Sequence, residues 1–333
     1  MTSWFDIAAR RALVAALGIA CAAVVAGCEP PAADDDSADD DTADDDDDGD
    51  PATIPLAGPC DLTDRRGGFV IEAYEEYSIV DGTVEDGTVP ISVLEEVLTE
   101  GGCRLMKRNN PFCDPPCDAD ETCDHDGQCV PYPAPVDLDT VTVNGLSELV
   151  SMDPVMPGYS YFDTSMPHPA FEPMSLVTLK TGGGGLDPFT LHGVGVHQLA
   201  VDGDSWVVEE GQPLAVSWPQ PGAESRSTVD LRLNIDQHGL SPVTVWCEFE
   251  DTGAGEVPAA VVDGLFAFGV SGFPNGALSR RTADSVSVGG GCVDLSVASP
   301  RAVDVDVAGY IPCDDEEDCP DELDCNETTG LCE

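Results

Sequence analysis

Val229-Asp230-Leu231-Arg232-Leu233-Asn234-Ile235 alternates apolar and polar side chains over seven residues. Because successive side chains of a β-strand point to opposite faces, this period of two predicts a half-buried antiparallel strand. The alternation recurs with turn residues between the runs, at 140–143, 175–179, 214–218, 243–247, 293–297 and 303–307. Residues 258–265 are the one helix candidate in this region, with Pro258 at a first turn. The pattern predicts a mainly β fold with an antiparallel β-sandwich over residues 134–312.

The first 27 residues have the layout of a secretory signal peptide. Arg10 and Arg11 precede a largely apolar stretch at 12–26, and small residues follow. A helix of that length reaches about 22 Å, less than the roughly 30 Å hydrocarbon core of a bilayer. Val25-Ala26-Gly27-Cys28 resembles the lipobox of bacterial lipoproteins. The resemblance implies cleavage before Cys28, acylation of Cys28 by fatty acids such as palmitate, and a membrane partner held through this lipid anchor.

An acidic tether follows the predicted lipidation site. Residues 34–50 contain twelve Asp in seventeen positions and no aromatic side chain, a composition that predicts disorder. A calcium-binding EF-hand loop starting at Asp44 would place Gly49 correctly, but Pro55 stands where the bidentate Glu is required. Glu29 takes the position where Asp is the usual inner-membrane retention signal of such lipoproteins, which favours the outer membrane of the cell envelope.

The net charge of the chain limits its partners. Asp and Glu total 64 against 13 Lys and Arg, giving −51. Nucleic acids and anionic lipid surfaces are poor partners for such a chain. The densest basic cluster after the signal peptide is Arg104, Lys107 and Arg108, and three charges do not make a phosphate-binding patch.

Cysteine spacing predicts six disulfides. Of the fourteen cysteines, Cys21 leaves with the signal peptide and Cys28 is acylated. The other twelve fall in even groups, as expected for an exported, oxidised protein. The groups are Cys60 and Cys103; Cys113, Cys117, Cys123 and Cys129; Cys247 and Cys292; and Cys313, Cys319, Cys325 and Cys332. The pairing inside each four-cysteine group stays open. Zinc binding is the competing interpretation, although neither group contains the CxxC pairs of zinc ribbons.

The two four-cysteine modules are similar to each other and resemble small EGF-like or dickkopf-like disulfide knots. Similar repeats occur in uncharacterised cysteine-rich lipoproteins of the myxobacterial type, and such knots serve as spacers or docking pieces. The expected organisation is a signal peptide at 1–27, a lipidated cysteine and tether at 28–59, a small disulfide-closed α+β domain at 60–112, a cysteine-rich module at 113–133, the β-sandwich at 134–312 and a second cysteine-rich module at 313–333.

Catalytic motifs are not evident in the sequence. His192 and His197 are five residues apart, unlike the HExxH pair of zinc proteases, and residues 269–273 miss the GxSxG pattern at the last position. We therefore expect a non-enzymatic protein without a cofactor or metal. The alternative is a secreted-type, metal-dependent hydrolase that uses His192 and His197, with Asp202 as a possible third ligand.

Aromatic residues suggest where a ligand would bind. Tyr159, Tyr161 and Phe162 lie in a loop rich in Pro, Gly and Met, and are the candidate binding residues. Trp218 and Trp246 end alternating runs and are expected in the core. The favoured function is binding or adhesion to a glycan or another envelope protein; a purely structural spacer is the further alternative.

Overall fold

The computed structural model describes residues 51, 53–108, 111–203, 205–222, 225–235, 243–271, 273–320 and 323–333. The predicted signal peptide, Cys28 and the Asp-rich run at 34–50 lie outside the described residues. Among the helices of the described part, none has the length and apolar character needed to cross a membrane.

A ten-stranded sheet forms the centre of the fold, confirming the predicted β class. Its order is β3-β4-β15-β14-β17-β18-β1-β2-β9, and β12 pairs with β18 outside this path. The strands are β1 (Arg65–Ala73), β2 (Ser78–Val84), β3 (Leu94–Glu100), β4 (Cys103–Arg108), β9 (Tyr161–Asp163), β12 (Ser205–Val208), β14 (Thr228–Asn234), β15 (Val243–Glu250), β17 (Asn275–Val288) and β18 (Gly291–Val307). Neighbours are antiparallel except β1–β18 and β12–β18, which are parallel.

Smaller elements cover one face of this sheet. A four-stranded sheet has the order β11-β10-β7-β8, and β13 pairs with β16. These elements are β7 (Val141–Asn144), β8 (Val150–Met152), β10 (Leu176–Thr181), β11 (Thr190–Val194), β13 (Leu214–Ser217), β16 (Ala254–Val257) and helix α1 (Ala259–Phe266). The helix is confirmed, with Pro258 as its N-cap. The runs at 293–297 and 303–307 are one continuous strand, β18.

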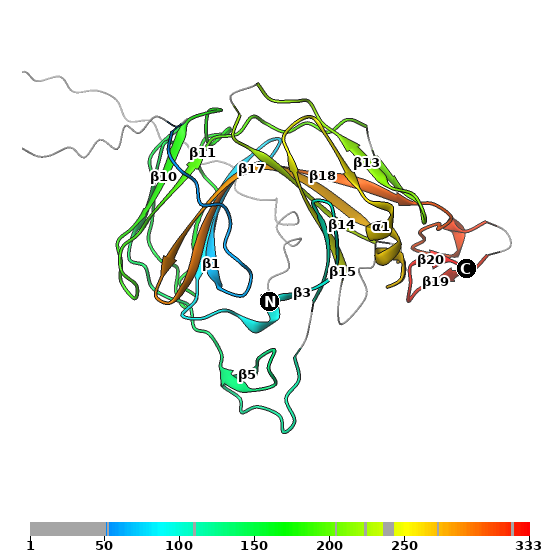
Figure 1. Cartoon of the computed structure of the whole chain (residues 1–333), viewed down its shortest axis with the longest axis horizontal. Coiled ribbons are helices and arrows are strands. Elements are labelled where there is room, and N and C mark those ends of the chain that lie inside the picture. The colour runs from blue at the N-terminus through cyan, green and yellow to red at the C-terminus, as the bar shows by residue number, and fades with distance from the viewer. Residues whose placement is uncertain are drawn as a thin grey trace, which may run out of the picture. The chain divides into compact units, whose positions relative to one another are not determined.

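Two hydrophobic cores lie along the same two long strands. Val293, Leu295 and Val297 of β18 enter the first core, whereas Val303 and Val305 enter the second. These side chains share the odd positions of one strand, so both cores lie on the same face of the ten-stranded sheet. Figure 1 shows β17 and β18 running from the side of β10 and β11 to the side of β13 and α1. We call the two halves the first and second lobes, and the opposite face of the sheet its outer face.

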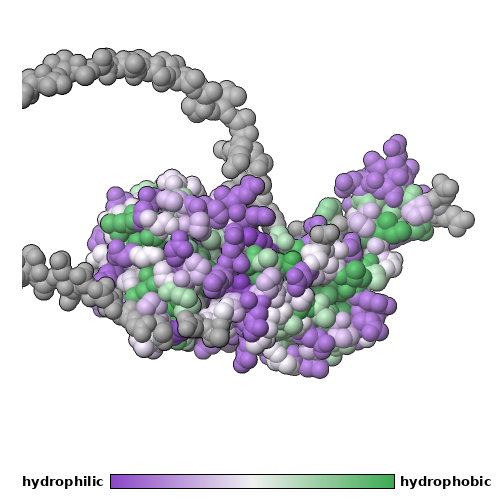
Figure 2. Space-filling view, turned by 90° about the horizontal axis from the view of Figure 1, so that it is seen from above, coloured by the Kyte–Doolittle hydropathy of each residue, from purple (hydrophilic) through white to green (hydrophobic). Residues whose placement is uncertain are grey.

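The chain carries a net charge of −51, and hydrophobic residues also reach its surface. On the side seen in Figure 2, hydrophilic residues surround smaller hydrophobic areas.

The segment 60–112 does not form the separate α+β domain that we expected. β1 lies between β18 and β2, and β4 pairs with β15, so its strands complete both lobes. Its only helical piece among the described residues is a 3₁₀ turn at Pro90–Ser92. The apolar side chains of β1, such as Phe69, need a facing layer that a segment of this size cannot supply, and they find it in the first core.

The long-range disulfides follow from this arrangement and correct the expected grouping. Cys60 pairs with Cys292 and Cys103 with Cys247, over sequence separations of 232 and 144 residues. Each bond therefore links the early segment to a strand of one lobe. Local cysteine counting suggested that Cys60 and Cys103 close a small domain, but sheet neighbours need not be neighbours in sequence.

The two small cysteine-rich modules are confirmed as disulfide knots, each with one hairpin. The hairpins are β5 (Glu121–Cys123) with β6 (Cys129–Pro131), and β19 (Cys325–Asn326) with β20 (Leu331–Cys332); a 3₁₀ turn lies at Glu316–Asp318. Both modules join the first cysteine to the third and the second to the fourth. The bonds are Cys113–Cys123, Cys117–Cys129, Cys313–Cys325 and Cys319–Cys332. With every sulfur of these clusters in a disulfide, no thiolate is available to zinc.

Candidate functional site

The structure separates the three aromatic residues predicted to bind a ligand. Tyr161 is completely buried in the first core, and its hydroxyl oxygen accepts a hydrogen bond of 2.7 Å from the Leu138 amide. Phe162 follows it on β9 and is 52% exposed on the outer face. Tyr159 is half-buried in the preceding loop. The prediction for Tyr161 is therefore wrong, since adjacent residues of a strand point to opposite faces.

The two histidines of the alternative hydrolase do not form a ligand cluster. His192 lies on β11 with its Nδ1 3.4 Å from Thr178 Oγ1, while His197 is exposed and its carbonyl accepts from Arg280. Within the described ranges, the groups of three or more possible ligands whose atoms lie within 4.8 Å consist of cysteines. His192 and His197 are not members of such a group.

A serine–histidine pair that the sequence did not suggest occurs in the first lobe. Ser78 Oγ lies 2.9 Å from His168 Nδ1 and accepts from the Ala170 amide at 3.1 Å. His168 Nε2 lies 3.0 Å from the Glu75 carbonyl, which makes Nε2 the donor and leaves Nδ1 to accept from Ser78. Because Ser78 is only 2% exposed, the pair fastens the loop before Ala170 to the β1–β2 turn and presents no accessible nucleophile.

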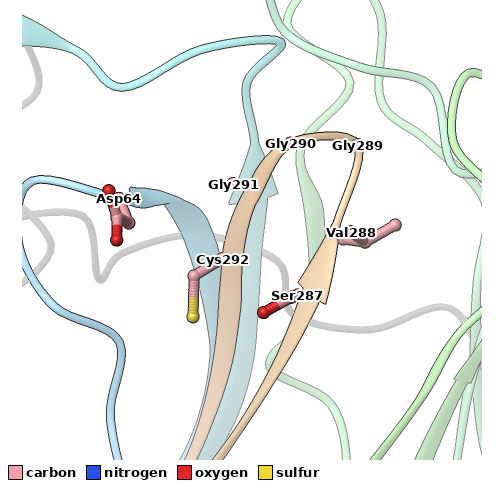
Figure 3. A pocket seen from close by; sticks show the side chains of 7 residues that line it. All are labelled: Asp64, Ser287, Val288, Gly289, Gly290, Gly291 and Cys292. Atoms are coloured by element: carbon pink, nitrogen blue, oxygen red, sulfur yellow. The ribbon is translucent and has the colours of Figure 1, made fainter.

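One surface recess of about 320 Å³ lies at the β17–β18 turn. Figure 3 shows Asp64 on one side of it, Ser287 and Cys292 on neighbouring strands, and three consecutive glycines at the turn. Cys292 is bonded to Cys60, and Asp64 is the one ionisable side chain of the lining. This lining has little with which to orient a ligand.

A second recess, of about 440 Å³, lies on the outer face of the second lobe. It contains three arginines, one tryptophan and two carboxylates, drawn from β4, β14, β15 and β17. We call this set the arginine–tryptophan face; its members are Arg104, Asp230, Arg232, Trp246, Glu248 and Arg281. The core-facing residues alternate with them, as Leu231 of β14 and Val245 and Cys247 of β15 show.

Strand register places an indole between two guanidinium groups. Trp246 of β15 is the direct partner of Arg232 on β14 and of Arg104 on β4. The guanidinium carbon of Arg232 lies 3.9 Å from the centroid of the Trp246 ring. A cation–π contact at this distance orients the arginine by stacking and leaves its in-plane N–H groups free for other acceptors.

The three arginines differ in how they are paired. Arg281 is neutralised by Asp230, with Nε–Oδ2 at 2.6 Å, and by Glu248, with Nη2–Oε2 at 3.0 Å. Arg232 has only a 3.8 Å contact with Asp230 and a 3.5 Å contact with the Leu231 carbonyl. The Arg104 side chain has no hydrogen bond or ion pair within the part of the chain that the structure describes. Arg104 and Arg232 thus retain unfilled N–H donors and have no close carboxylate partner among the described residues.

Burial and neighbouring positive charge both affect the pKa of Arg232. Burial lowers the pKa of Arg232 to about 10, with Asp230 opposing the shift and Arg281 and Arg104 adding to it. The side chain remains cationic at neutral pH. Three guanidinium groups against two carboxylates give the arginine–tryptophan face a local charge of +1 in a chain of −51.

Sequence reasoning missed this site. Trp218 is buried as expected, at 2% exposure, but Trp246 is half-buried on the outer face. Its place between core residues Val245 and Cys247 was the available signal, because alternation requires Trp246 to face the other way. No sequence signal could join Arg104 to Arg232.

No protein-family model and no curated protein matches the chain. Among solved structures, the crystal structure of the chicken CNTN1 FN1–FN3 domains matches over 64% of this chain at 7% identity and a TM-score of 0.16. The matched part spans 65% of that chain, just under two thirds of its length. A match at this TM-score supports no statement about ligand or mechanism.

Proposed function

We propose that this chain is a non-enzymatic, lipid-anchored protein of the bacterial cell envelope that binds an envelope glycan or protein through the arginine–tryptophan face. The observation that carries the proposal is the row Arg104–Trp246–Arg232, an indole flanked by two cations with unfilled donors. Tryptophan and arginine are the residue types that dominate binding energy at interfaces.

The location of these residues supports a preformed site. They lie on β4, β14 and β15, which are paired on both sides in the sheet and whose other face is packed into the second core. Side chains on packed strands hold their positions better than side chains on loops. The row therefore needs little ordering when a ligand arrives, which lowers the entropic cost of binding.

The proposed lipid anchor and the proposed oxidising compartment are supported by the lipobox and by the disulfides. The lipobox at residues 25–28 supports acylation of Cys28, and six disulfides support an oxidising compartment. An acylated Cys28 would hold the protein to the outer membrane while residues 29–50 separate the lobes from the bilayer. The expected tether at 28–59 is too long at its C-terminal end, because the Pro51 carbonyl accepts from Arg226 and the Ala57 amide donates to Asp284.

Binding to isolated envelope fractions tests the function. We expect Trp246→Ala to reduce retention of the purified full chain about tenfold, because the indole is lost together with the stacking contact that orients Arg232. Phe162→Ala is the matched control, since Phe162 is an exposed aromatic on the same face of the same sheet at its other end. Equal retention of the Trp246 variant and the parent chain would place binding elsewhere.

Fractionation tests the anchor separately. Cys28→Ser is expected to move the protein from the membrane fraction to the soluble fraction. A C-terminal tag followed during treatment of intact cells with a non-permeating protease then reports the side of the membrane. Cleavage on intact cells would place the lobes outside, and protection until the envelope is disrupted would place them in the periplasm.

A further inference from the structure

We infer that the arginine–tryptophan face takes a carboxylate-bearing sugar chain, an acidic polysaccharide of the uronate type. The inference rests on the proposed binding function and deepens it. The residues of the face make some contacts with each other and leave other hydrogen-bonding groups open, and these open groups indicate the chemical class of the ligand.

The guanidinium groups of Arg104 and Arg232 favour an anionic ligand. Arg281 already has two carboxylate partners, whereas Arg104 has none among the described residues and Arg232 has contacts no shorter than 3.5 Å. Arg104 and Arg281 both lower the pKa of Arg232, so like charges repel here. A bound carboxylate would relieve this repulsion and supply acceptors for the unfilled N–H groups.

The carboxylates of the arginine–tryptophan face favour a ligand that also donates hydrogen bonds from hydroxyl groups. Asp230 is 7% exposed and lines the recess, and its Oδ1 has no hydrogen-bond partner among the described residues. Glu248 Oε2 accepts from Arg281, and the Glu248 side chain is 54% exposed. The exposed Glu248 carboxylate can accept from hydroxyl groups of a ligand, whereas the buried Asp230 Oδ1 adds negative charge beneath the recess. Asp230 and Glu248 also disfavour a doubly charged phosphate more than a singly charged carboxylate.

The indole completes the match to a sugar ring. Trp246 is half-buried between the two arginines and offers an apolar surface against which the C–H groups of a sugar ring can pack. The recess of about 440 Å³ lies within the usual size range of ligand sites. Cations, hydroxyl acceptors and an aromatic surface together fit a ring that carries a carboxylate and hydroxyls.

Titration with matched sugars tests the inference. The probes are an oligogalacturonate and the methyl ester of the same oligomer, which differ only in charge, added to the purified full chain in detergent. We expect the acid to bind at least tenfold more tightly than the ester. Arg104→Gln and Arg232→Gln should each weaken binding of the acid about tenfold, the loss expected for one charge-assisted hydrogen bond. Lys180→Gln, which makes the same charge change on β10 of the first lobe, should not change it.

Other outcomes overturn the inference in distinguishable ways. Equal binding of acid and ester, or unchanged binding by both arginine variants, would refute the role given to charge. Polyglutamate binding as tightly as the oligogalacturonate would refute the sugar and point to an acidic peptide. If Trp246→Ala still reduced retention on envelope fractions in these cases, the proposed function would stand without the uronate. If retention did not depend on Trp246 either, both the proposed function and the uronate inference would fail.

Discussion

The two lobes share β17 and β18 but join their layers with different chemistry. In the first lobe, Thr282 donates to the Val194 carbonyl at 2.8 Å and accepts from its amide at 3.0 Å, while Asp284 accepts from the His192 amide at 2.9 Å. In the second lobe, the preceding core-facing residue of β17 is Arg280, a charged side chain only 2% exposed. One strand thus contributes polar cross-links to one lobe and a buried cation to the next.

Arg280 is fully satisfied by its surroundings. Its Nε and Nη2 bond the two oxygens of Asp251 at 2.6 and 3.1 Å, and Nη2 also donates to the Pro219 carbonyl at 2.7 Å. Asp251 in turn accepts from Trp218 Nε1 at 2.7 Å and from Ser227 Oγ at 2.6 Å. A buried ion pair of this kind is costly to break, because the surviving partner remains charged and desolvated. The stability of the second lobe therefore depends more strongly on a single contact, the Arg280–Asp251 ion pair, than the stability of the first lobe does.

The largest effect should come from breaking that pair. We expect Arg280→Met to lower the free energy of unfolding by about 3–5 kcal/mol, because Asp251 is left buried without a counter-charge. Chemical denaturation followed by far-UV circular dichroism reports both lobes, and the fluorescence of Trp206, Trp218 and Trp246 reports the second lobe. The control is Thr282→Val, which should cost about 1–3 kcal/mol through the lost β11 contacts. Equal losses for the two variants would contradict the contrast between the lobes.

The long-range disulfides distinguish the lobes next. Replacing Cys103 and Cys247 by alanine, or Cys60 and Cys292, should each cost about 2–5 kcal/mol, because each bond closes a loop of more than a hundred residues. Loss of Cys103–Cys247 should lower hydrogen-exchange protection mainly in the second lobe. Loss of Cys60–Cys292 should lower it mainly in the first lobe.

Peptide mapping under non-reducing conditions checks the pairing directly. A bond between Cys60 and Cys103 would contradict the integrated sheet. Replacement of Cys319 and Cys332 is the control, because that bond closes a short loop within the C-terminal module and should leave both cores unchanged.

Glu72, on the outer face of the first lobe, should make the stability of the protein depend on pH. Desolvation raises the pKa of Glu72 above 4.5, with Asp81 adding to the shift and the Tyr74 hydroxyl opposing it. A carboxyl group whose pKa is raised by folding stabilises the protein below its unfolded pKa, and this stability is lost as the pH rises through the folded pKa. Each tenfold difference in proton affinity between the folded and unfolded chain corresponds to about 1.4 kcal/mol of stability.

Glu72→Gln should remove this dependence while keeping an acceptor for Tyr74. We expect the variant to gain stability over the parent chain as the pH increases above 4.5, measured by denaturation from pH 4 to 8 with hydrogen exchange of β1 as the local readout. A constant difference between the two proteins over this range would show that Glu72 is not the titrating group.

The smallest effect on stability belongs to the residues proposed to bind. Arg232→Gln removes a stacking contact on a partly exposed side chain and should cost about 0.5–1 kcal/mol. Denaturation followed by tryptophan fluorescence measures the change. A loss above about 2 kcal/mol would mean that the stack supports the second lobe rather than a ligand site.

Much of the strand pattern could be predicted from the sequence. The alternating run at 229–235 became β14, and the helix candidate after Pro258 became α1. β17 escaped prediction because its residues, Asn275–Val288, are mostly small or polar and carry little apolar periodicity. The sequence alone places Tyr161 wrongly, because Tyr159, Tyr161 and Phe162 lie together in a loop-like stretch, whereas strand alternation divides Tyr161 and Phe162 between core and outer face.

Composition and local spacing by themselves determined the β class, the acidic surface and the two small cysteine knots, because these depend on residues that are close in sequence. The tertiary structure alone decided which strands are neighbours, and with them the bonds Cys60–Cys292 and Cys103–Cys247 and the row Arg104–Trp246–Arg232. The physical reason is that a period of two specifies which face of a strand is buried but not which strand it pairs with. That choice is made by the packing of both cores against one shared sheet.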